Sequence, residues 1–218
     1  MAITFYYGSG SPYAWRVWLA LEHKGLPYEL KILSFSEGDL RKAEFQQLNP
    51  RRKVPVIVDD GFALYESVAI VEYLQDRYPE AAPLLPFDIR RRAVARRLMM
   101  ETDCYLGQAI EQLVDEVLFK AAQERNEQCI AEAKASCLKE LAYFESVLHG
   151  DYLAGEFSAA DLCLYPLLAL LVRIEKKRPD LNISEHLDRK VTTWMRRIES
   201  LPYFDKIYPP HWREVSKV

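Results

Sequence analysis

ITFYYGSGSPYAW occupies residues 3–15, and this stretch sets the fold class of the chain. Its first five residues are β-branched or aromatic and predict a strand, and the glycines that follow predict a turn. Ser11 is a natural N-cap and Pro12 suits the first position of a helix, so a helix begins there. Apolar residues then recur at helical spacing until Gly25 ends the helix. The chain therefore opens with a strand, a loop and a helix.

Short elements continue in this alternating manner to about residue 80. A hairpin is predicted where two short apolar runs flank the Asp60-Gly61 turn. Pro55, within the first of these runs, predicts either an edge strand or a special backbone such as a cis peptide. The order β-α-β-α-β-β-α predicts an α/β domain over residues 1–80. The expected strands cover 28–33, 54–58 and 62–65, and the expected helices cover 40–47 and 67–78.

The rest of the chain predicts an all-α domain over residues 87–218. Pro79, Pro83 and Pro86 mark the linker, and no strand is predicted after Asp88. The fold class is therefore an α/β domain followed by an all-α domain. Helices are expected over 88–119, 126–148, 158–172 and 188–201.

A capping box marks the start of the third of these helices. Ser158 is followed three residues later by Asp161, which takes the place of the usual glutamate. Phe157 and Leu162 stand where a hydrophobic staple belongs. Residues 162–168 are apolar on all sides, so we expect the helix to run buried through its domain. The box serves folding and carries no chemistry.

Composition and charge exclude several classes of protein. The 218 residues are 50% hydrophobic with a net charge of −3, which gives no general attraction to nucleic acid or anionic lipid. No apolar stretch approaches the roughly 18 residues that span a bilayer, and the chain begins with no signal-peptide pattern. The arginines between residues 90 and 97 are interpreted as a solvated or subunit-facing helix surface. We therefore expect a cytoplasmic protein without nucleic-acid or membrane partners.

Neither cysteine nor histidine has the spacing of a metal site. The cysteines form no CxxC pair and the histidines form no HExxH motif, so we expect no bound metal. We expect reduced, buried and inert thiols. The four cysteines are Cys104, Cys129, Cys137 and Cys163.

The beginning of the first helix is the candidate site. The helix dipole and the amide groups beside Ser11 favour an anion there, although the residue can also be an ordinary N-cap. A thiol–disulfide enzyme with this β-α-β start places a cysteine at that position, where the dipole lowers its pKa. Residues 11–14 read Ser-Pro-Tyr-Ala instead, so dithiol redox catalysis is absent at this site. The hydroxyl can still donate a hydrogen bond to a thiolate that a ligand supplies.

Several short motifs follow one another along the chain. They are Ser11-Pro12-Tyr13-Ala14-Trp15-Arg16-Val17, Asn49-Pro50, Lys53-Val54-Pro55, Glu66-Ser67, the Ser158 capping box, and Trp194 with Arg197-Ile198. In this order and spacing the chain resembles the cytosolic glutathione S-transferases over essentially its whole length. It is most similar to the serine-type classes, tau, zeta and theta. The resemblance implies a thioredoxin-like N-terminal domain that binds glutathione and a C-terminal helical bundle domain that contributes the electrophile pocket.

The resemblance also implies a role for each motif toward glutathione. Ser67 would bind the γ-glutamyl carboxylate through its amide and hydroxyl, and Glu66 would pair with the γ-glutamyl ammonium. Val54, which precedes the family's cis-proline at Pro55, would pair with the cysteinyl backbone like an added strand. Lys53 would reach the glycyl carboxylate. Ser11 would hydrogen-bond the glutathione sulfur and hold it as the thiolate nucleophile.

Some of these positions have a second interpretation. Tyr6 ranks second to Ser11 as the sulfur partner, because the tyrosine-type classes use a tyrosine near the end of the first strand. Glu66-Ser67 can be a plain helix start, and Lys53 a solvated lysine. Arg41 is the nearest substitute for the basic or amide side chain that some members place before the Asn-Pro motif. The residues expected near the electrophile are Tyr105 and Gln108, with Met100 and Trp212 in the same region, although aromatics at such spacing are more often core.

The expected function is transfer of glutathione, as a co-substrate, to a small hydrophobic electrophile by a cytoplasmic homodimer active in detoxification. A zeta-like isomerase that uses glutathione as a cofactor is the nearest alternative. It requires a second Ser or Cys beside the catalytic serine, where this chain has Pro12 and Tyr13. The third alternative is a non-catalytic member of the fold that acts as a binding or regulatory module. The presence of Ser11, Val54-Pro55 and Glu66-Ser67 favours glutathione binding at least.

Overall fold

The computed structural model describes residues 3–213 of the chain. Within that range, the residues up to Leu85 and those from Leu201 onward form one compact unit, and Pro86–Ser200 form a second. The division at residue 85 lies between the two expected domains. The residues from Leu201 onward group with the first unit because aromatic side chains there pack on Trp15 of the first helix.

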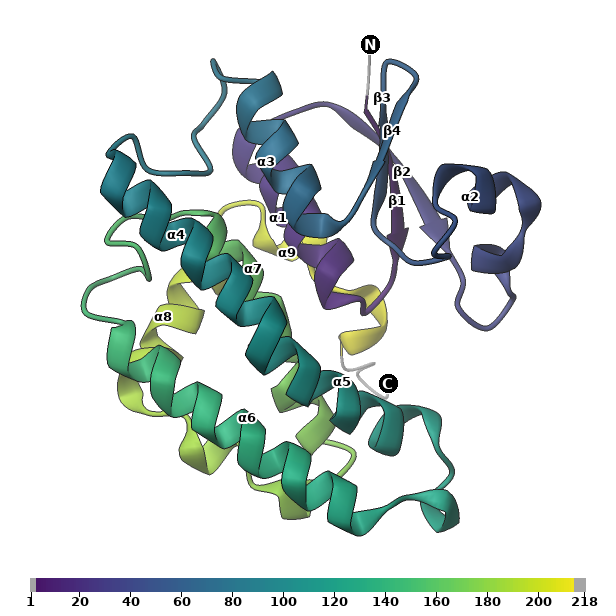
Figure 1. Ribbon diagram of the computed structural model, residues 1–218, viewed down its shortest axis with the longest axis vertical. Coiled ribbons are helices and arrows are strands. Elements are labelled where there is room, and N and C mark those ends of the chain that lie inside the picture. Colours follow the sequence, from purple (N-terminus) through teal and green to yellow (C-terminus); the bar gives the residue numbers. More distant parts are fainter. Residues whose placement is uncertain (1–2, 214–218) are drawn as a thin grey trace, which may run out of the picture. The chain divides into compact units, whose positions relative to one another are not determined.

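A four-stranded mixed sheet with strand order β2-β1-β3-β4 forms the base of the first unit. β1 pairs with β2 in parallel, while β3 is antiparallel to both β1 and β4. Figure 1 shows α1 and α3 on one side of the sheet and α2 on the other. The elements are β1 (Ile3–Gly8), α1 (Pro12–Lys24), β2 (Tyr28–Leu33), η1 (Asp39–Arg41), α2 (Ala43–Leu48), β3 (Val56–Asp59), β4 (Phe62–Tyr65), α3 (Ser67–Arg77), α9 (Phe204–Ile207) and η7 (Pro210–Trp212).

The predicted order of strands and helices in the first unit is confirmed. α1 begins after Ser11 and ends at Gly25, whose φ of +63° is the left-handed conformation typical of a helix C-cap. α2 begins at Ala43, later than predicted, because Lys42 is extended and separates the helix from the short 3-10 turn η1. α9 and η7 were not predicted from the sequence.

Pro55 lies before β3 and not within it. The Val54–Pro55 peptide bond is cis, so the interpretation of a special backbone is confirmed. The interpretation of an edge strand is wrong, because β3 lies between β1 and β4. The strand begins only at Val56, so the missing proline N–H leaves no gap in the ladder.

The second unit is all-helical over its described residues, as predicted. One helical segment, interrupted by two π-helical stretches, runs from Ile89 to Phe119. Three further long helices follow, and polar residues cap the four segments at Asp88, Asn126, Ser158 and Asp188. The elements are α4 (Ile89–Glu101), η2 (Thr102–Gly107), α5 (Gln108–Val114), η3 (Asp115–Phe119), η4 (Ala122–Glu124), α6 (Glu127–Val147), α7 (Ala159–Glu175), η5 (Pro179–Leu181), η6 (Ser184–His186) and α8 (Arg189–Glu199).

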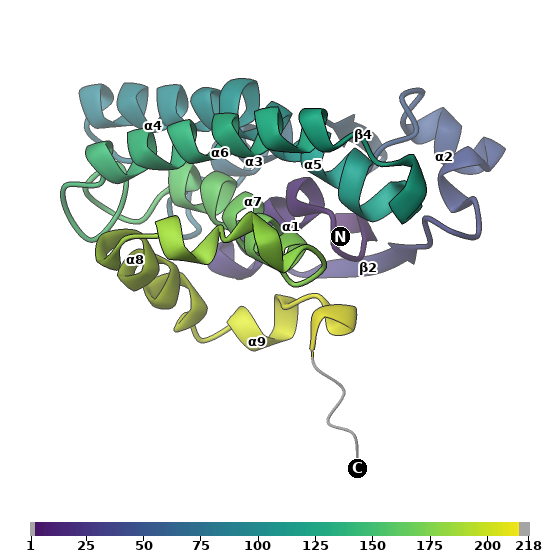
Figure 2. The same ribbon diagram turned by 90° about the horizontal axis from the view of Figure 1, so that it is seen from below.

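The predicted capping box holds the start of α7. Asp161 is fully buried and accepts hydrogen bonds from the backbone N–H of Ser158 at 2.9 Å, that of Leu153 at 3.0 Å, and Nε1 of Trp194 at 2.8 Å. Burial raises the pKa of Asp161 to about 6, although these hydrogen bonds oppose the rise. Figure 2 shows α7 between the layer of α4 and α6 and helix α8, and most of its residues are buried. The expectation of a buried central helix is confirmed.

Two further expectations concern the arginines and the cysteines of the second unit. Arg90, Arg91, Arg96 and Arg97 are exposed in the single chain, which agrees with a solvated or subunit-facing helix surface. Burial of the cysteines is confirmed for Cys137 and Cys163 but is wrong for Cys104, which lies on the exposed face of η2, and Cys129 is only half-buried. No helix in residues 3–213 is long and apolar enough to cross a membrane.

Candidate active site

Ser11 lies at the N-terminus of α1 and caps it. Its backbone is extended, and its Oγ accepts a hydrogen bond from the Ala14 N–H over 3.2 Å. A serine hydroxyl has one hydrogen to donate besides the lone pair used in the cap, so capping leaves the donor available. The first turn of α1 contains no acidic residue that would compete for the positive end of the helix. The position therefore combines one hydroxyl donor with a helix N-terminus.

The loop before Ser11 is fixed by hydrogen bonds to β1. The Ser11 N–H donates to the Gly8 carbonyl over 3.0 Å, and the Gly10 N–H donates to the Tyr7 hydroxyl over 3.4 Å. Burial raises the pKa of the Tyr7 phenol, while hydrogen bonds with Gly10 and Ser9 oppose the rise. Tyr7 is therefore a neutral phenol at neutral pH that supports the loop.

Tyr6, the second candidate for the sulfur partner, lies on the other face of β1. Its ring centroid is 6.0 Å from that of Phe45 in α2. Adjacent residues in a strand point to opposite faces, so Tyr6 faces α2 while Phe5 and Tyr7 pack against Trp18 of α1. The structure brings Ser11 to the start of α1 and leaves Tyr6 on the opposite side of the sheet.

A second helix N-terminus lies at Ser67, the first residue of α3. Glu66 precedes it with φ +70°, a conformation that residues other than glycine rarely adopt. Such backbone strain costs on the order of 1–3 kcal/mol and is found mostly where function requires it. The Glu66 side chain is exposed, and its Oε1 lies 4.0 Å from Nε of Arg51. Because both side chains are exposed, this ion pair adds little to the stability of the fold. The backbone at this helix start is therefore strained, and the assignment of Glu66-Ser67 to a ligand stays a prediction.

Arg16 connects the two helix N-termini. Its side chain is fully buried, and its Nη1 donates to the Ser67 Oγ over 3.4 Å. The guanidinium also lies over the Tyr13 ring, 5.0 Å from the centroid. Arg16 stands five residues after Ser11, about 7.5 Å along a helix axis. The beginning of α3 therefore lies within reach of the Arg16 side chain, at the same end of α1 as Ser11.

Asn49 shapes the loop that carries Lys53 and Val54. Its buried side chain donates from Nδ2 to the Lys53 carbonyl over 2.7 Å and accepts from the Arg51 N–H over 2.9 Å. Arg52 has φ +57° in the tight turn that results. Val54 and Pro55 are buried, and Lys53 is exposed. The loop thus presents three exposed cations, Arg51, Arg52 and Lys53, and a fixed backbone beside β3.

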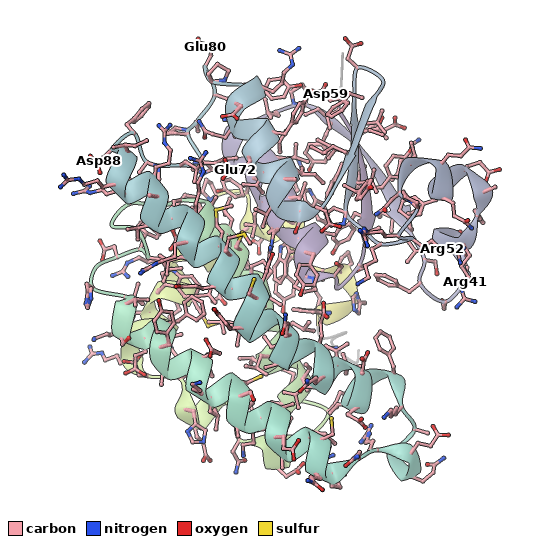
Figure 3. All side chains as sticks on the ribbon, viewed as in Figure 1. Arg41, Arg52, Asp59, Glu72, Glu80 and Asp88 are labelled. Atoms are coloured by element: carbon pink, nitrogen blue, oxygen red, sulfur yellow. The ribbon has the colours of Figure 1, made fainter. Side chains whose placement is uncertain are left out.

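The remaining candidates lie in η1, in the C-terminal segment of the first unit, or in the second unit. Arg41 is exposed in η1, and Figure 3 shows it with Arg52 at the α2 end of the first unit. Tyr105 and Gln108 are exposed in the second unit, in η2 and at the start of α5. Trp212 is a core residue of the first unit, 6% exposed, as the more common interpretation predicts.

Sequence reasoning assigned no role to Arg16 or Asn49. Arg16 leaves a signal, since it is the one charged residue in the apolar run 14–21 of the predicted helix. A buried charged side chain needs hydrogen-bonding partners, so an arginine at this position predicts a polar residue packed against the helix. Asn49 was part of a quoted motif, but its two hydrogen bonds depend on the turn that only the structure defines.

Residues 3–213 contain no group of three or more His, Cys, Asp or Glu side chains that could hold a metal ion. The chemistry that the described side chains offer is anion binding at two helix N-termini, one with a free hydroxyl donor and one with a buried guanidinium. These groups suit a flexible ligand with an acidic thiol and a carboxylate. None of them is a nucleophile or a strong base.

A thioredoxin-like unit followed along the chain by an all-helical unit is the domain organisation of the cytosolic glutathione S-transferases, and a serine at this helix N-terminus fits that class. Residues 10–77 match the N-terminal domain family of glutathione S-transferases, and residues 97–202 match the C-terminal domain family. Together these matches cover more than half of the chain. The chain belongs to the cytosolic glutathione S-transferase family and is an enzyme.

Individual relatives agree with this assignment. The chain is 29% identical to glutathione S-transferase A of Pleuronectes platessa, over 97% of its own length and 93% of the relative. It is 31% identical to probable maleylacetoacetate isomerase 2 of Drosophila melanogaster, over 90% and 83% of the two chains. A glutathione transferase structure from Burkholderia graminis, with two glutathione molecules bound per subunit, is 25% identical, with a TM-score of 0.85 over 97% of this chain and 89% of that one.

Proposed function

We propose that this enzyme conjugates the thiolate of reduced glutathione to a small hydrophobic electrophile, and that Ser11 stabilises the thiolate. The observation that carries the proposal is the position of Ser11 as N-cap of α1, with its Oγ accepting from Ala14 and its hydroxyl hydrogen left to donate. The reactive sulfur comes from the ligand, because no cysteine stands at position 11.

The expected energies fit this role. A thiol has a pKa of about 8.5, so only a few per cent is thiolate at neutral pH. A helix N-terminus stabilises an anion by about 0.3–1 kcal/mol, and a hydrogen bond to a charged group by about 1.5–3 kcal/mol. Since one pKa unit corresponds to about 1.4 kcal/mol, the two effects together correspond to about one to three units, and we expect a shift of about one to two units from a single hydroxyl donor. About half of the bound thiol is then thiolate near pH 7.

The rest of glutathione is assigned to the neighbouring groups. The γ-glutamyl carboxylate binds the N-terminus of α3 at Ser67, where the Arg16 guanidinium adds positive charge. Glu66 pairs with the γ-glutamyl ammonium. The Val54 backbone pairs with the cysteinyl residue, and Lys53 binds the glycyl carboxylate.

Other groups in this proposal carry less weight. Tyr105 and Gln108, which are exposed in the second unit, contact the electrophile, and Arg41 contributes positive charge near the glycyl end. Tyr6 stays the second candidate for the sulfur partner and ranks below Ser11, because its ring packs on Phe45 at the face of the sheet away from α1. The enzyme is proposed to be a cytoplasmic homodimer that serves detoxification, as the family resemblance implies. Light scattering of the purified enzyme, which gives its mass in solution, tests the dimer.

A glutathione-dependent isomerase is the second candidate, because some relatives carry the name maleylacetoacetate isomerase. An isomerase returns glutathione at the end of each turnover, whereas a transferase consumes it. The residues after Ser11 are Pro12 and Tyr13, so the second serine or cysteine expected beside the catalytic serine of a zeta-like isomerase is not present. We therefore place the transferase first.

Two measurements test the proposed function. Calorimetric titration with reduced glutathione should give binding in the micromolar to millimolar range, and a chloronitroarene electrophile should give a thioether with one glutathione consumed per product. Absence of binding at millimolar glutathione would refute the proposal. Turnover of a cis-dienone acid without glutathione consumption would favour the isomerase.

A further inference from the structure

The last described residues of the chain pack on the first unit and not with the helices that precede them. Lys206 pairs with Glu22 of α1, and its ammonium lies 5.2 Å from the centroid of the Tyr28 ring. The Tyr203 hydroxyl and Nδ1 of His23 are hydrogen-bonded at 3.1 Å. In Figure 1 this segment, which contains α9, runs beside α1. Several independent contacts therefore attach residues 203–207 to α1.

An aromatic cluster continues the attachment toward the active-site end of α1. The fully buried Trp15 is surrounded by the rings of Phe204, Tyr208 and Trp212, with centroids 6.0, 5.8 and 5.4 Å away. Aromatic pairs at these distances contribute on the order of 0.5–1.5 kcal/mol each beyond their buried area. Trp15 is four residues from Ser11, so the cluster brings residues 210–212 to the beginning of α1.

His211 then reaches the loop that precedes Ser11. Its Nδ1 is hydrogen-bonded to the Ser9 Oγ at 2.7 Å. The ring also lies close against Gly10, because a Cβ on that residue would stand 2.9 Å from Cε1 of His211. Gly10 has φ +87°, so glycine is required both by its conformation and by this close approach. One side of the loop is thus held by Tyr7 and the other by His211.

We propose that His211 is a positioning residue for the thiolate site: it holds Ser9 and Gly10 so that the next residue, Ser11, keeps its hydroxyl aimed at the glutathione sulfur. The inference rests on the proposed function. It adds a role for the C-terminal segment, which lies 200 residues from Ser11 in the sequence. His211 acts through the loop and makes no contact with the reacting atoms in this account.

The physical reason is the freedom of the loop. A glycine-containing loop samples many backbone states unless contacts restrict it, and each residue that is fixed costs about 1–2 kcal/mol of entropy. The Ser9–His211 hydrogen bond and the His211 ring against Gly10 restrict the loop in the free enzyme. The entropy of ordering the loop is therefore already lost before glutathione binds. Without them, Ser11 spends less time in the orientation that stabilises the thiolate, so the pKa of the bound thiol rises.

The experiment uses the full-length enzyme and measures three quantities: the thiol pKa of bound glutathione, kcat and KM. We expect His211→Ala to raise the thiol pKa and to lower kcat at neutral pH by about 3- to 10-fold, the range that one hydrogen bond supplies. The KM for glutathione should change less than twofold, since the γ-glutamyl and glycyl groups bind elsewhere. His211→Asn keeps a polar group near the Nδ1 position and should restore most of kcat.

A double-mutant cycle separates positioning from general packing. Because Ser9→Ala removes the same hydrogen bond, Ser9→Ala/His211→Ala should be no slower than His211→Ala alone. His186→Ala changes an exposed histidine of the second unit and is the matched control, with unchanged kinetics expected. A melting curve for each variant shows that the fold is retained.

Three results would overturn the inference. They are wild-type kinetics and thiol pKa in His211→Ala, effects of Ser9→Ala and His211→Ala that simply add, and a lowered kcat that His211→Asn does not restore. Failure of the wild-type enzyme to bind or ionise glutathione would instead refute the proposed function, and with it the role of His211 in catalysis. The wild-type measurement therefore distinguishes the two failures.

Discussion

The Nη1 atom of Arg16 donates to the Ser67 Oγ over 3.4 Å, and this contact joins the beginnings of α1 and α3. Arg16 is fully buried and Ser67 is 7% exposed, so the pair lies in a low-dielectric environment. A guanidinium held there raises the positive potential at the N-terminus of α3. In the proposed complex, the γ-glutamyl carboxylate meets a helix N-terminus and a fixed cation together.

Arg16→Lys should therefore weaken glutathione binding. A lysine keeps the charge but cannot present the planar guanidinium to Ser67 while stacking on Tyr13. The loss of a charge-assisted contact predicts a Kd for glutathione raised about 10-fold in calorimetric titration. Arg90→Lys, at an exposed position of the second unit, serves as the control. A Kd equal to that of the wild type would show that Arg16 only packs.

Asp161→Ala should destabilise the enzyme without touching the glutathione site. The substitution removes the acceptor for the buried N–H groups of Leu153, Ser158 and Trp194. Unsatisfied buried donors predict a loss of about 3–5 kcal/mol in the free energy of unfolding, measured in urea. Asp188→Ala removes an ordinary N-cap and should cost only about 1 kcal/mol. Equal losses in the two variants would contradict the structural role assigned to the box.

The pH dependence of stability should carry the signature of Asp161. Its pKa is raised from 3.8 to about 6 in the folded state. Between pH 3.8 and about pH 6, Asp161 is therefore mostly protonated in the folded protein and mostly ionised in the unfolded chain. That contribution, on the order of 3 kcal/mol, is fully present below about pH 4 and is lost as the pH rises to about 6. Urea unfolding at intervals from pH 4 to 6.5 measures it. Asp161→Asn should remove this part of the slope, and an unchanged slope would assign it to other groups.

The cysteines should divide into two reactive and two protected residues. Cys104 is exposed and Cys129 half-buried, whereas Cys137 and Cys163 are buried. Burial raises the pKa of the Cys137 thiol to about 12, so almost no thiolate forms at neutral pH. Alkylation with iodoacetamide and mass spectrometry should find label at Cys104 first and at Cys129 more slowly. Native labelling of Cys137 would contradict its placement in the core.

Local sequence signals predicted most of the fold. Ser11-Pro12, Gly25 and the Ser158–Asp161 box each mark a helix boundary through their own side chains or backbone, so a single sequence carries the information. Pro55 left two interpretations open, since the sequence does not say where the ladder begins. The short helix α9 was missed because four residues give no periodicity.

The candidate site was predictable only in part. Ser11, Glu66 and Ser67 are helix-boundary residues, and their places follow from local rules. Arg16 and His211 act through contacts over 51 and 202 residues of sequence, which no local pattern encodes. Such contacts depend on how α1 packs against α3 and against the C-terminal segment, and the structure supplies that packing.

The central claim is that the Ser11 hydroxyl stabilises the glutathione thiolate, and titration of the enzyme-bound thiol tests it most directly. Thiolate ultraviolet absorbance followed against pH gives the pKa in the wild type, in Ser11→Ala and in Ser11→Thr, which keeps a hydroxyl. We predict a wild-type pKa about one to two units below the free value of about 8.5, a rise of about one unit in Ser11→Ala, and a value near wild type in Ser11→Thr. The same pKa in Ser11→Ala as in the wild type would contradict the claim.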